Sequence, residues 1–152
     1  MPNVDKIYLD ANFLVAYFVN NHSDHNASKI LFFNLLKQNS SLYISTLGLD
    51  EAWFKIWEAS QPNTTNRKPF KDFYSIFKGV LTQLQNLSTM NIIQFENDFH
   101  RVVENSIENI GNFSLRPRDA FHLAYMQDLG INQIITKDKK FDHVSGITVT
   151  SF

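Results

Sequence analysis

The stretch Ile7-Tyr8-Leu9-Asp10-Ala11-Asn12 decides the fold, because a short apolar run ends at an acidic residue and a helical pattern begins directly after it. Three large, mostly apolar residues before a carboxylate predict a buried β-strand over residues 6–9. Residues 11–19 predict a helix that ends near Asn20-Asn21. A buried strand leading straight into a helix is typical of an α/β fold with a parallel sheet.

The same alternation continues to the end of the chain. Further strands are predicted at residues 42–45, 91–95, 133–136 and 147–150. Further helices are predicted at residues 25–38, from 46 to about 57, 70–86, 97–110 and 118–128. Such alternation implies parallel pairing with right-handed crossovers. The predicted fold class is therefore a three-layer α/β/α sandwich, with residues 1–152 forming one domain.

Some details of these helices can also be predicted. Thr46 is expected to cap the helix that follows the second strand, and Gly130 to end the helix over 118–128. A loop is expected over residues 112–117, because Pro117 disfavours a helical conformation at Arg116. The helix near 97–110 is expected to turn its apolar side chains inward, namely Phe99, Val102, Val103, Ile107 and Ile110.

Composition limits the possible chemistry. The chain has 43% hydrophobic residues and no cysteine, which excludes disulfides, thiolate zinc sites and a cysteine nucleophile. This composition fits a reducing cytoplasm. We expect no signal peptide, because residues 1–6 contain no basic region followed by a long apolar stretch. No run approaches the roughly 18 apolar residues of a membrane span. The net charge is −1, although basic residues cluster at 67–71, 116–118 and 137–140.

Four carboxylates occupy the positions where strands end or helices begin. Asp10 ends the first strand, Asp138 closely follows the strand near 134–136, and Glu51 and Asp119 each open a helical pattern. In an open parallel sheet, a site forms at the carboxyl ends of the strands. Acidic oxygen ligands suit Mg²⁺ or Mn²⁺ better than a softer metal. The pattern predicts metal-assisted hydrolysis, with a phosphodiester as the substrate.

One acid at a helix N-terminus is ordinary, but all four in this order form a pattern that resembles the PIN-domain family of ribonucleases. Within that family, the chain is similar to the toxin component of VapBC toxin–antitoxin pairs. The matching segments are residues 7–12, 45–51, 115–124 and 135–142. The resemblance implies a five-stranded parallel sheet of order 3-2-1-4-5, an acidic pocket for Mg²⁺ or Mn²⁺, and cleavage of RNA. The residues that match the family's acidic positions are Asp10, Glu51, Asp119 and Asp138.

The resemblance also assigns supporting residues and shows one departure. Asn12 and Thr136 match small polar positions that would orient the ligands through hydrogen bonds. Lys140 stands where many relatives carry another acid, so Asp142 is an alternative to Asp138 as the fourth acid. His122, one turn after Asp119, is expected either to pack in the interior or to reach the pocket. His22 and His25 are expected at the surface.

Apolar residues on the helices at 11–19 and 25–38 suggest an interface, because they exceed what one buried face needs: Phe13, Tyr17, Phe18, Phe32, Phe33 and Leu36. In the resembled family, such surfaces serve homodimerisation and binding of a small antitoxin. We therefore expect a homodimer, and an antitoxin that places an apolar helix near 11–36 and a basic side chain toward Asp10 and Asp119. The competing expectation is that these aromatic residues all fill the core.

Other functions remain open from the sequence. A phosphatase of the haloacid dehalogenase type would need a second acid where this chain has Asn12, and a receiver domain would need an acidic pair near the N-terminus. An RNA-processing nuclease without an antitoxin, or a non-catalytic RNA- or protein-binding α/β module, would keep the fold. All four acids are present, which weighs against loss of activity.

Overall fold

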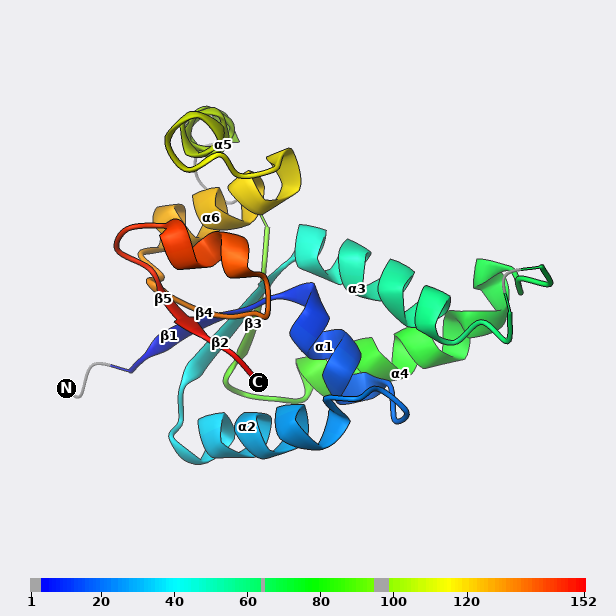
Figure 1. Cartoon of the computed structure of the whole chain (residues 1–152). Coiled ribbons are helices and arrows are strands. Elements are labelled where there is room, and N and C mark those ends of the chain that lie inside the picture. Colours follow the sequence, from blue (N-terminus) through cyan, green and yellow to red (C-terminus); the bar gives the residue numbers. More distant parts are fainter. Residues whose placement is uncertain (1–3, 64, 95–98) are drawn as a thin grey trace.

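The computed structural model describes residues 4–63, 65–94 and 99–152, and within this part of the chain the strands form one five-stranded parallel sheet. The strands lie in the order β3-β2-β1-β4-β5, which confirms the predicted topology (Figure 1). Their bounds are Lys6–Leu9 for β1, Ser41–Ser45 for β2, Met90–Ile93 for β3, Gln133–Ile135 for β4 and Thr148–Thr150 for β5.

The central strand β1 separates two apolar cores. Ile7 and Leu9 pack in one core with residues of the first four helices, whereas Tyr8, which points to the other face, packs in a second core. Tyr8 and Leu9 are both fully buried, at 0% exposure. A strand that is covered on both faces reads as a continuous apolar run, which is why residues 7–9 show no polar alternation.

Helices cover both faces of the sheet, as expected for the α/β/α class (Figure 1). On one side lie α1 (Ala11–Phe18), α2 (His25–Lys37), α3 (Thr46–Ala59) and α4 (Tyr74–Gln85). On the other side lies α6 (Pro117–Leu129), with α5 (Phe99–Phe113) packed on its outer surface. Short 3₁₀ helices, η1 (Phe70–Phe73) and η2 (Lys139–His143), precede α4 and β5.

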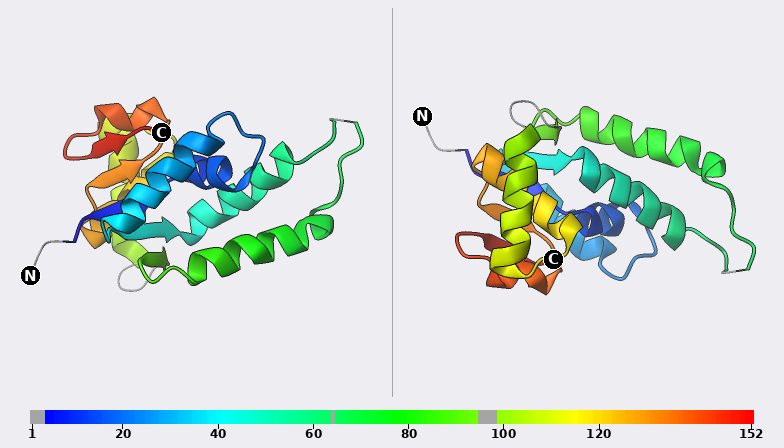
Figure 2. Two further views of the ribbon diagram at one scale, coloured as in Figure 1. Left: turned by 90° about the horizontal axis from the view of Figure 1, so that it is seen from below. Right: turned by 90° about the horizontal axis from the view of Figure 1, so that it is seen from above.

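The helices α3 and α4 run side by side and project away from the sheet (Figures 1 and 2). We call α3, the loop after it, η1 and α4 the arm. Because α3 begins where β2 ends, the base of the arm lies at the carboxyl edge of the sheet. In the described residues, no helix has both the length and the hydropathy that crossing a membrane requires.

Several predicted boundaries differ from the structure. The helix predicted over 70–86 begins as the 3₁₀ turn η1, and α5 continues to Phe113, so the predicted loop at 112–117 is shorter. Pro117 is the first residue of α6, where its missing N–H costs no hydrogen bond. Gly130 caps α6 in the left-handed conformation, with φ of 62°. Residue 95 of the third predicted strand and residues 97–98 of the fifth predicted helix lie outside the described residues.

The predicted inward face of α5 is confirmed at Val102 but wrong at Ile107 and Ile110. Ile107 and Ile110 are 62% and 39% exposed, whereas Val102, Ser106 and Asn109 are buried. The reason is a polar contact: Asn109 exchanges hydrogen bonds of 3.0 and 3.1 Å with Gln127 of α6 and donates to the Ala120 carbonyl. Because α5 packs on α6 through these side chains, part of its apolar face stays in solvent. The side chain of Phe99 lies outside the described residues.

The helix α3 is capped by Ser45 rather than by Thr46. The Ser45 hydroxyl accepts a hydrogen bond of 3.0 Å from the Gly48 backbone N–H. The same hydroxyl lies 2.6 Å from the Tyr8 hydroxyl, inside the core. This pair fixes the start of α3 relative to β1, so it also fixes the position of Glu51 in the second turn of α3.

We predict that Ser45→Ala destabilises the fold by about 1–3 kcal/mol, because a buried N–H loses its acceptor and the Tyr8 hydroxyl loses a partner. Thermal unfolding measures this as a fall in Tm of about 2–4 °C for each kcal/mol. The control Ser75→Ala changes an exposed residue of α4 and should stay within about 0.5 kcal/mol of the wild type. An unchanged Tm for Ser45→Ala would show that the cap is dispensable.

Candidate functional site

Asp10 lies where β1 ends, and its carboxylate is 8% exposed. Two side chains hold one of its oxygens: Thr136 Oγ1 donates to Oδ2 over 2.7 Å, and Asn12 Nδ2 donates to the same atom over 3.1 Å. Asn12 and Thr136 are thus hydrogen-bonded to Asp10, and their role in orienting a metal ligand stays a prediction. Burial raises the pKa of Asp10 above its usual value, although the Thr136 hydrogen bond opposes this effect.

Glu51 faces Asp10 from α3 and is 9% exposed. Its Oε1 lies 3.1 Å from Arg118 Nε, and its Oε2 lies 3.2 Å from His122 Nε2. Burial alone would raise the pKa of Glu51, but the hydrogen bond and charge of His122, with the charges of Lys55 and Arg118, hold the pKa below its usual value. Two neighbouring carboxyl groups therefore have opposite pKa shifts.

His122 is buried and also contacts Glu51, so it both packs in the interior and reaches the acidic pocket. It is 3% exposed, its Nδ1 lies 2.7 Å from the Tyr8 hydroxyl, and its Nε2 contacts Glu51. A carboxylate can only accept, so Nε2 donates to Glu51. A chain of buried hydrogen bonds thus runs from the Gly48 backbone through Ser45, Tyr8 and His122 to Glu51.

Ligand atoms of Asp10, Glu51 and His122 all lie within 4.8 Å of one another. Asp10 directly follows β1, Glu51 lies in α3 and His122 lies in α6, so the three residues are far apart in the sequence. Among the described residues, this is the set of three acidic or histidine side chains that could hold a metal ion. His22 and His25 are not part of it. His22 instead lies 3.8 Å from Asp24, and His25 Nδ1 lies 3.0 Å from the Ala16 carbonyl.

Asp119 and Asp138 lie beside this group but outside it, and Lys140 joins them. Lys140 Nζ is 3.5 Å from Asp119 Oδ2 and 3.4 Å from Asp138 Oδ2. Asp138 is also linked to Asp10, because its backbone N–H donates over 2.9 Å to Thr136 Oγ1, the hydroxyl that bonds Asp10. The lysine that departs from the family pattern therefore balances two of the predicted acids.

Asp142 has a different environment. It lies in η2, its side chain is exposed, and it lines a small hollow of about 100 Å³ together with Thr136, Asp138 and Val149. Asp138 shares Thr136 with Asp10, whereas Asp142 is not among the residues that touch Asp10 or Glu51 in the contacts described above. The geometry favours Asp138 over Asp142 as the fourth acid, and the roles of the four acids stay predictions.

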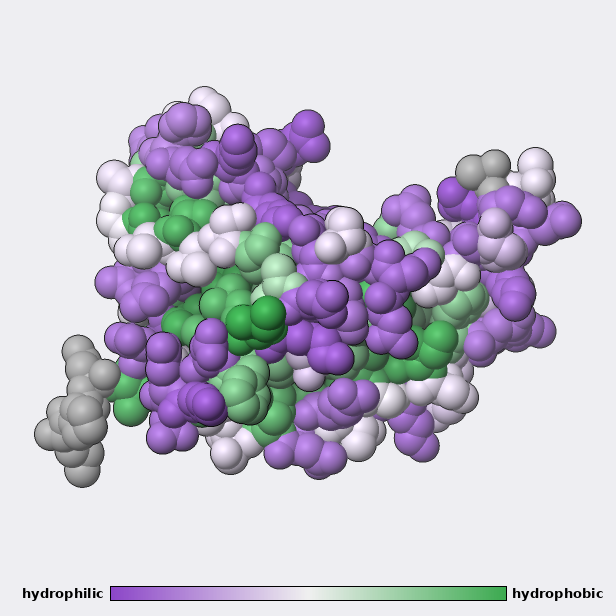
Figure 3. Space-filling view, turned by 60° about the horizontal axis from the view of Figure 1, so that its bottom comes forward, coloured by the Kyte–Doolittle hydropathy of each residue, from purple (hydrophilic) through white to green (hydrophobic). Residues whose placement is uncertain are grey.

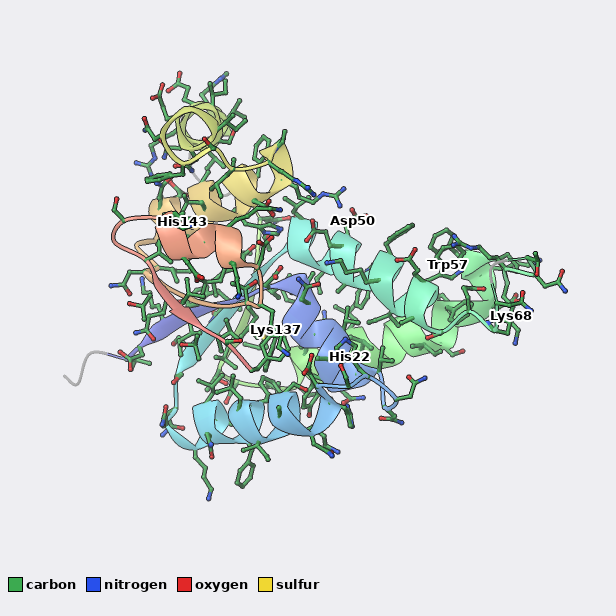
Figure 4. All side chains as sticks on the ribbon, in the orientation of Figure 1. His22, Asp50, Trp57, Lys68, Lys137 and His143 are labelled. Atoms are coloured by element: carbon green, nitrogen blue, oxygen red, sulfur yellow. The ribbon has the colours of Figure 1, made fainter. Side chains whose placement is uncertain are left out.

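The sequence patterns did not indicate several polar residues of the site, among them Tyr8, Lys55 and Arg118. Arg118 belongs to the basic cluster at 116–118 and pairs with Glu51 while it stays largely exposed. Lys55, four residues after Glu51, donates to Asn12 Oδ1 over 2.5 Å. The spacing of Lys55 is a signal, because residues four apart share a helix side. Asp50 is exposed, and Figure 4 places it at the start of α3, so the site uses only one of the two adjacent acids.

Three solved structures similar to this chain come from toxin–antitoxin systems. Mycobacterium tuberculosis VapC20, described as a sarcin-ricin loop cleaving toxin, matches with a TM-score of 0.65 and 15% identity over 90% of this chain and 92% of that chain. VapBC2 of Rickettsia felis, bound to promoter DNA, matches with a TM-score of 0.63 and 14% identity over 96% and 98%. A toxin–antitoxin complex of Klebsiella pneumoniae matches with a TM-score of 0.59 and 19% identity over 93% and 95%.

These identities are low, so the structural likeness concerns the fold. No curated protein matches the chain by sequence. The model of the PIN domain, in contrast, matches residues 7–147, which include the first strand, all four predicted acids and His122. Since this match spans nearly the whole sequence, the chain belongs to the PIN domain family.

Proposed function

We propose that this protein is a metal-dependent endoribonuclease that hydrolyses RNA phosphodiesters, with Asp10, Glu51, Asp119 and Asp138 as its catalytic acids. The observation that carries the proposal is the meeting of buried Asp10 and Glu51, with His122, within 4.8 Å at the carboxyl edge of a PIN-domain sheet. Two carboxylates are expensive to bury together unless positive charge compensates them.

The donor set fits Mg²⁺ or Mn²⁺. Its carboxylate oxygens are the hard ligands that these ions prefer, and no thiolate is present to favour a softer metal. Both hydrogen bonds to Asp10 go to Oδ2, so Oδ1 is the oxygen that Asp10 can offer. Asp10 and Asp119 would be the main ligands, and Glu51 and Asp138 would hold a second ion or position the attacking water. The bound ion would act as a Lewis acid on the phosphate.

Residues of the chain itself would position the attacking water, hold Glu51 in place and contact the RNA phosphate. Glu51 stays ionised because its pKa is lowered, so it can orient a water molecule and accept its proton as the water oxygen attacks phosphorus and the P–O3′ bond breaks. This reaction leaves a 5′-phosphate and a 3′-hydroxyl. His122 acts as a positioning residue, because its Nε2 holds Glu51 while Tyr8 holds its ring. Arg118, 58% exposed, can exchange its contact with Glu51 for an RNA phosphate.

We further propose that the protein is the toxin of a toxin–antitoxin pair and that it acts in the cytoplasm, where its RNA substrate is found. Three toxin structures with the same fold support the proposal. The proposed partner is a small antitoxin with an apolar helix that lies near residues 11–36. A basic side chain of the antitoxin would reach Asp10 and Asp119 and add to the positive charge there.

The surface proposed for assembly is partly apolar. Phe13 and Phe32 fill the core, but Phe33 is 57% exposed and Ile30 is 65% exposed. Tyr17, Phe18 and Leu36 line an apolar cavity of about 230 Å³ with Leu84 and Leu87 of the α4 side. Figure 3 shows apolar side chains in separate patches between hydrophilic residues on this side of the molecule. We propose that this surface also supports a homodimer.

We predict that RNA cleavage requires Mg²⁺ or Mn²⁺, stops in EDTA, and is abolished by Asp10→Asn and Asp119→Asn. Each change removes a charge that the cation needs, and the loss should exceed about 100-fold, the size expected when a catalytic group is removed. A gel assay with end-labelled RNA measures both the rate and the product ends. Asp138→Asn should lose more activity than Asp142→Asn.

The matched control is Asp50→Asn, which removes the exposed acid next to Glu51 and should leave cleavage unchanged. Full cleavage in EDTA with 2′,3′-cyclic phosphate ends would rule out the proposed chemistry. Near-normal cleavage by Asp119→Asn would show that the site is assigned wrongly. Either result would leave a non-catalytic module or a different nuclease as the better description.

We predict opposite effects on stability for the two buried acids when no metal is present. The pKa of Asp10 is higher in the folded state than in the unfolded state. Its contribution to the free energy of unfolding is therefore full when the pH is below about 3.9, the pKa of the unfolded state, and is lost as the pH rises through the pKa of the folded state. Asp10→Asn should therefore raise Tm at pH 7–8, with a gain that shrinks toward low pH. Glu51→Gln should lower Tm at neutral pH, because the lowered pKa of Glu51 reflects stabilising contacts.

Thermal unfolding in EDTA between pH 4 and 8 provides the measurement. Adding Mg²⁺ or Mn²⁺ should then raise the Tm of the wild type, since a ligand that binds only the folded state stabilises it. Asp10→Asn should lose this metal-induced shift. If Asp10→Asn lowered Tm at neutral pH and kept the metal shift, Asp10 would be a structural carboxylate rather than a ligand.

We predict a homodimer in solution that Phe33→Asp dissociates, because a charge in an apolar interface loses its solvation. Sedimentation of the isolated chain at tens of micromolar measures the mass. Val4→Asp, at another exposed apolar residue, is the control and should leave the mass unchanged. A wild-type monomer under these conditions would reject the interface.

A further inference from the structure

The far end of the arm presents exposed aromatic rings with basic residues around them. Phe54 of α3 and Phe70 of η1 are 48% and 49% exposed, while Trp57 between them is 8% exposed. We call Phe54, Trp57 and Phe70 the aromatic tip. Exposed rings of this size are costly in water, and they have no role in the site described above.

The rings of the aromatic tip form an open stack. Trp57 and Phe70 lie nearly parallel, with centroids 4.3 Å apart and planes 21° apart. Phe54 lies beside both, 5.7 Å from Trp57 and 6.4 Å from Phe70. Because Trp57 is covered and Phe70 is half-exposed, the outer part of Phe70 remains accessible to another flat ring. A nucleobase is such a ring.

The charges around the aromatic tip favour a polyanion. Residues 56–72 contain three basic residues and two acidic ones, a net charge of +1 in a chain of net charge −1. Arg67, Lys68 and Lys71 are exposed, and the Arg67 guanidinium lies 5.3 Å from the Trp57 ring centroid. An apolar protein partner would gain little from these cations, whereas a nucleic-acid backbone would bind them.

The basic loop is held in place by the rings and by α3. Trp57 Nε1 donates to the Lys68 carbonyl over 2.8 Å, and the Lys68 N–H donates to Gln61 Oε1 over 2.8 Å. Gln61 in turn donates to the Trp57 carbonyl over 3.0 Å. Figure 4 places Trp57 and Lys68 together at the end of the arm. The backbone of the basic loop is therefore anchored beside the aromatic rings, which lowers the entropy cost of ordering the loop on binding.

The aromatic tip is also in line with the acidic site. Phe54 follows Glu51 by three residues and so lies on the same side of α3, one turn farther out. Trp57 is six residues from Glu51, or roughly 9 Å along the helix axis. Between them, Lys55 contacts Asn12, which contacts Asp10. A strand that leaves the acidic site along α3 would meet Phe54 first and the basic loop next.

We propose that the aromatic tip is a binding platform for single-stranded RNA, on which bases stack against Phe54 and Phe70 while Arg67, Lys68 and Lys71 contact the phosphates. This inference rests on the proposed function for its substrate class. The platform holds the strand on one side of the acidic site and favours unpaired RNA, because paired bases cannot leave their own stack without a cost.

Binding of a fluorescently labelled single-stranded oligoribonucleotide of mixed sequence, measured in EDTA so that cleavage does not interfere, tests the proposal. The double variant Phe54→Leu/Phe70→Leu keeps the apolar volume but loses the rings, so it should weaken binding at least about tenfold. Phe54→Tyr/Phe70→Tyr keeps both rings and should bind within about twofold of the wild type. If both variants have Tm values similar to that of the wild type, the substitutions at these half-exposed positions leave the fold intact.

The contribution of the basic residues is measured separately, from the salt dependence of RNA binding. Lys68→Ala/Lys71→Ala should reduce the dependence of log Kd on log salt concentration by about 1.4, the value for two phosphates of a single strand. Lys6→Ala, at the opposite end of β1, is the charge control and should leave the slope unchanged. RNA binding by the leucine variant with the affinity of the wild type would overturn the proposal. An unchanged salt slope in the lysine variant would overturn it as well.

The test separates this inference from the proposed function. If the wild type binds RNA through Phe54 and Phe70 but does not cleave it with any divalent ion, the platform stands and the nuclease proposal fails. If the wild type cleaves RNA and the leucine variant binds and cleaves equally well, the nuclease proposal stands and the platform fails.

Discussion

The rest of the structure depends on the burial of β1 on both of its faces. Ile7 and Leu9 belong to one core and Tyr8 to the other, so a shift of this strand by one residue would exchange the two cores. Its register with β2 and β4 aligns Tyr8 with Tyr43 and with Ile134. The same register places the ends of the three strands together. Asp10, Ser45 and Thr136 then follow at one edge, and the site is built from them.

Hydrogen bonds between the strand ends fix the positions of the acidic side chains relative to the sheet. Thr136 after β4 bonds Asp10 after β1, and Ser45 at the end of β2 bonds Tyr8 within β1. His122 adds α6 to this arrangement through Tyr8 and Glu51. Because these groups are buried, breaking one bond leaves a partner unsatisfied, which costs more than the bond itself contributes. The carboxylates are therefore held by the same contacts that hold the core.

The alternation of strands and helices could be predicted because it depends on local patterns, whereas the strand order was implied by the resemblance to the PIN-domain family. An apolar run that ends in an acid marks a strand end, and Asp119 after Pro117 marks a helix start. The contacts that pair distant side chains could not be predicted. Lys140 between Asp119 and Asp138, or Arg118 on Glu51, depends on which loops come together. For α5, periodicity placed Val102 correctly but Ile107 and Ile110 wrongly, because Asn109 and Gln127 form a polar contact that hydrophobic spacing does not report.

The distribution of charge explains why a net charge of −1 is compatible with RNA as a substrate. The acids that would bind metal are grouped at the sheet edge, where Lys55, Arg118 and Lys140 already offset part of their charge. The basic excess lies on the arm, beyond the acidic site along α3. Fields from charges separated by more than about 8–10 Å are largely screened at physiological salt, so the exposed cations beyond Trp57 are partly screened from the acids. An RNA strand would therefore respond to the basic arm and to the acidic site as separate local fields, and the total charge of the chain would have little influence on binding.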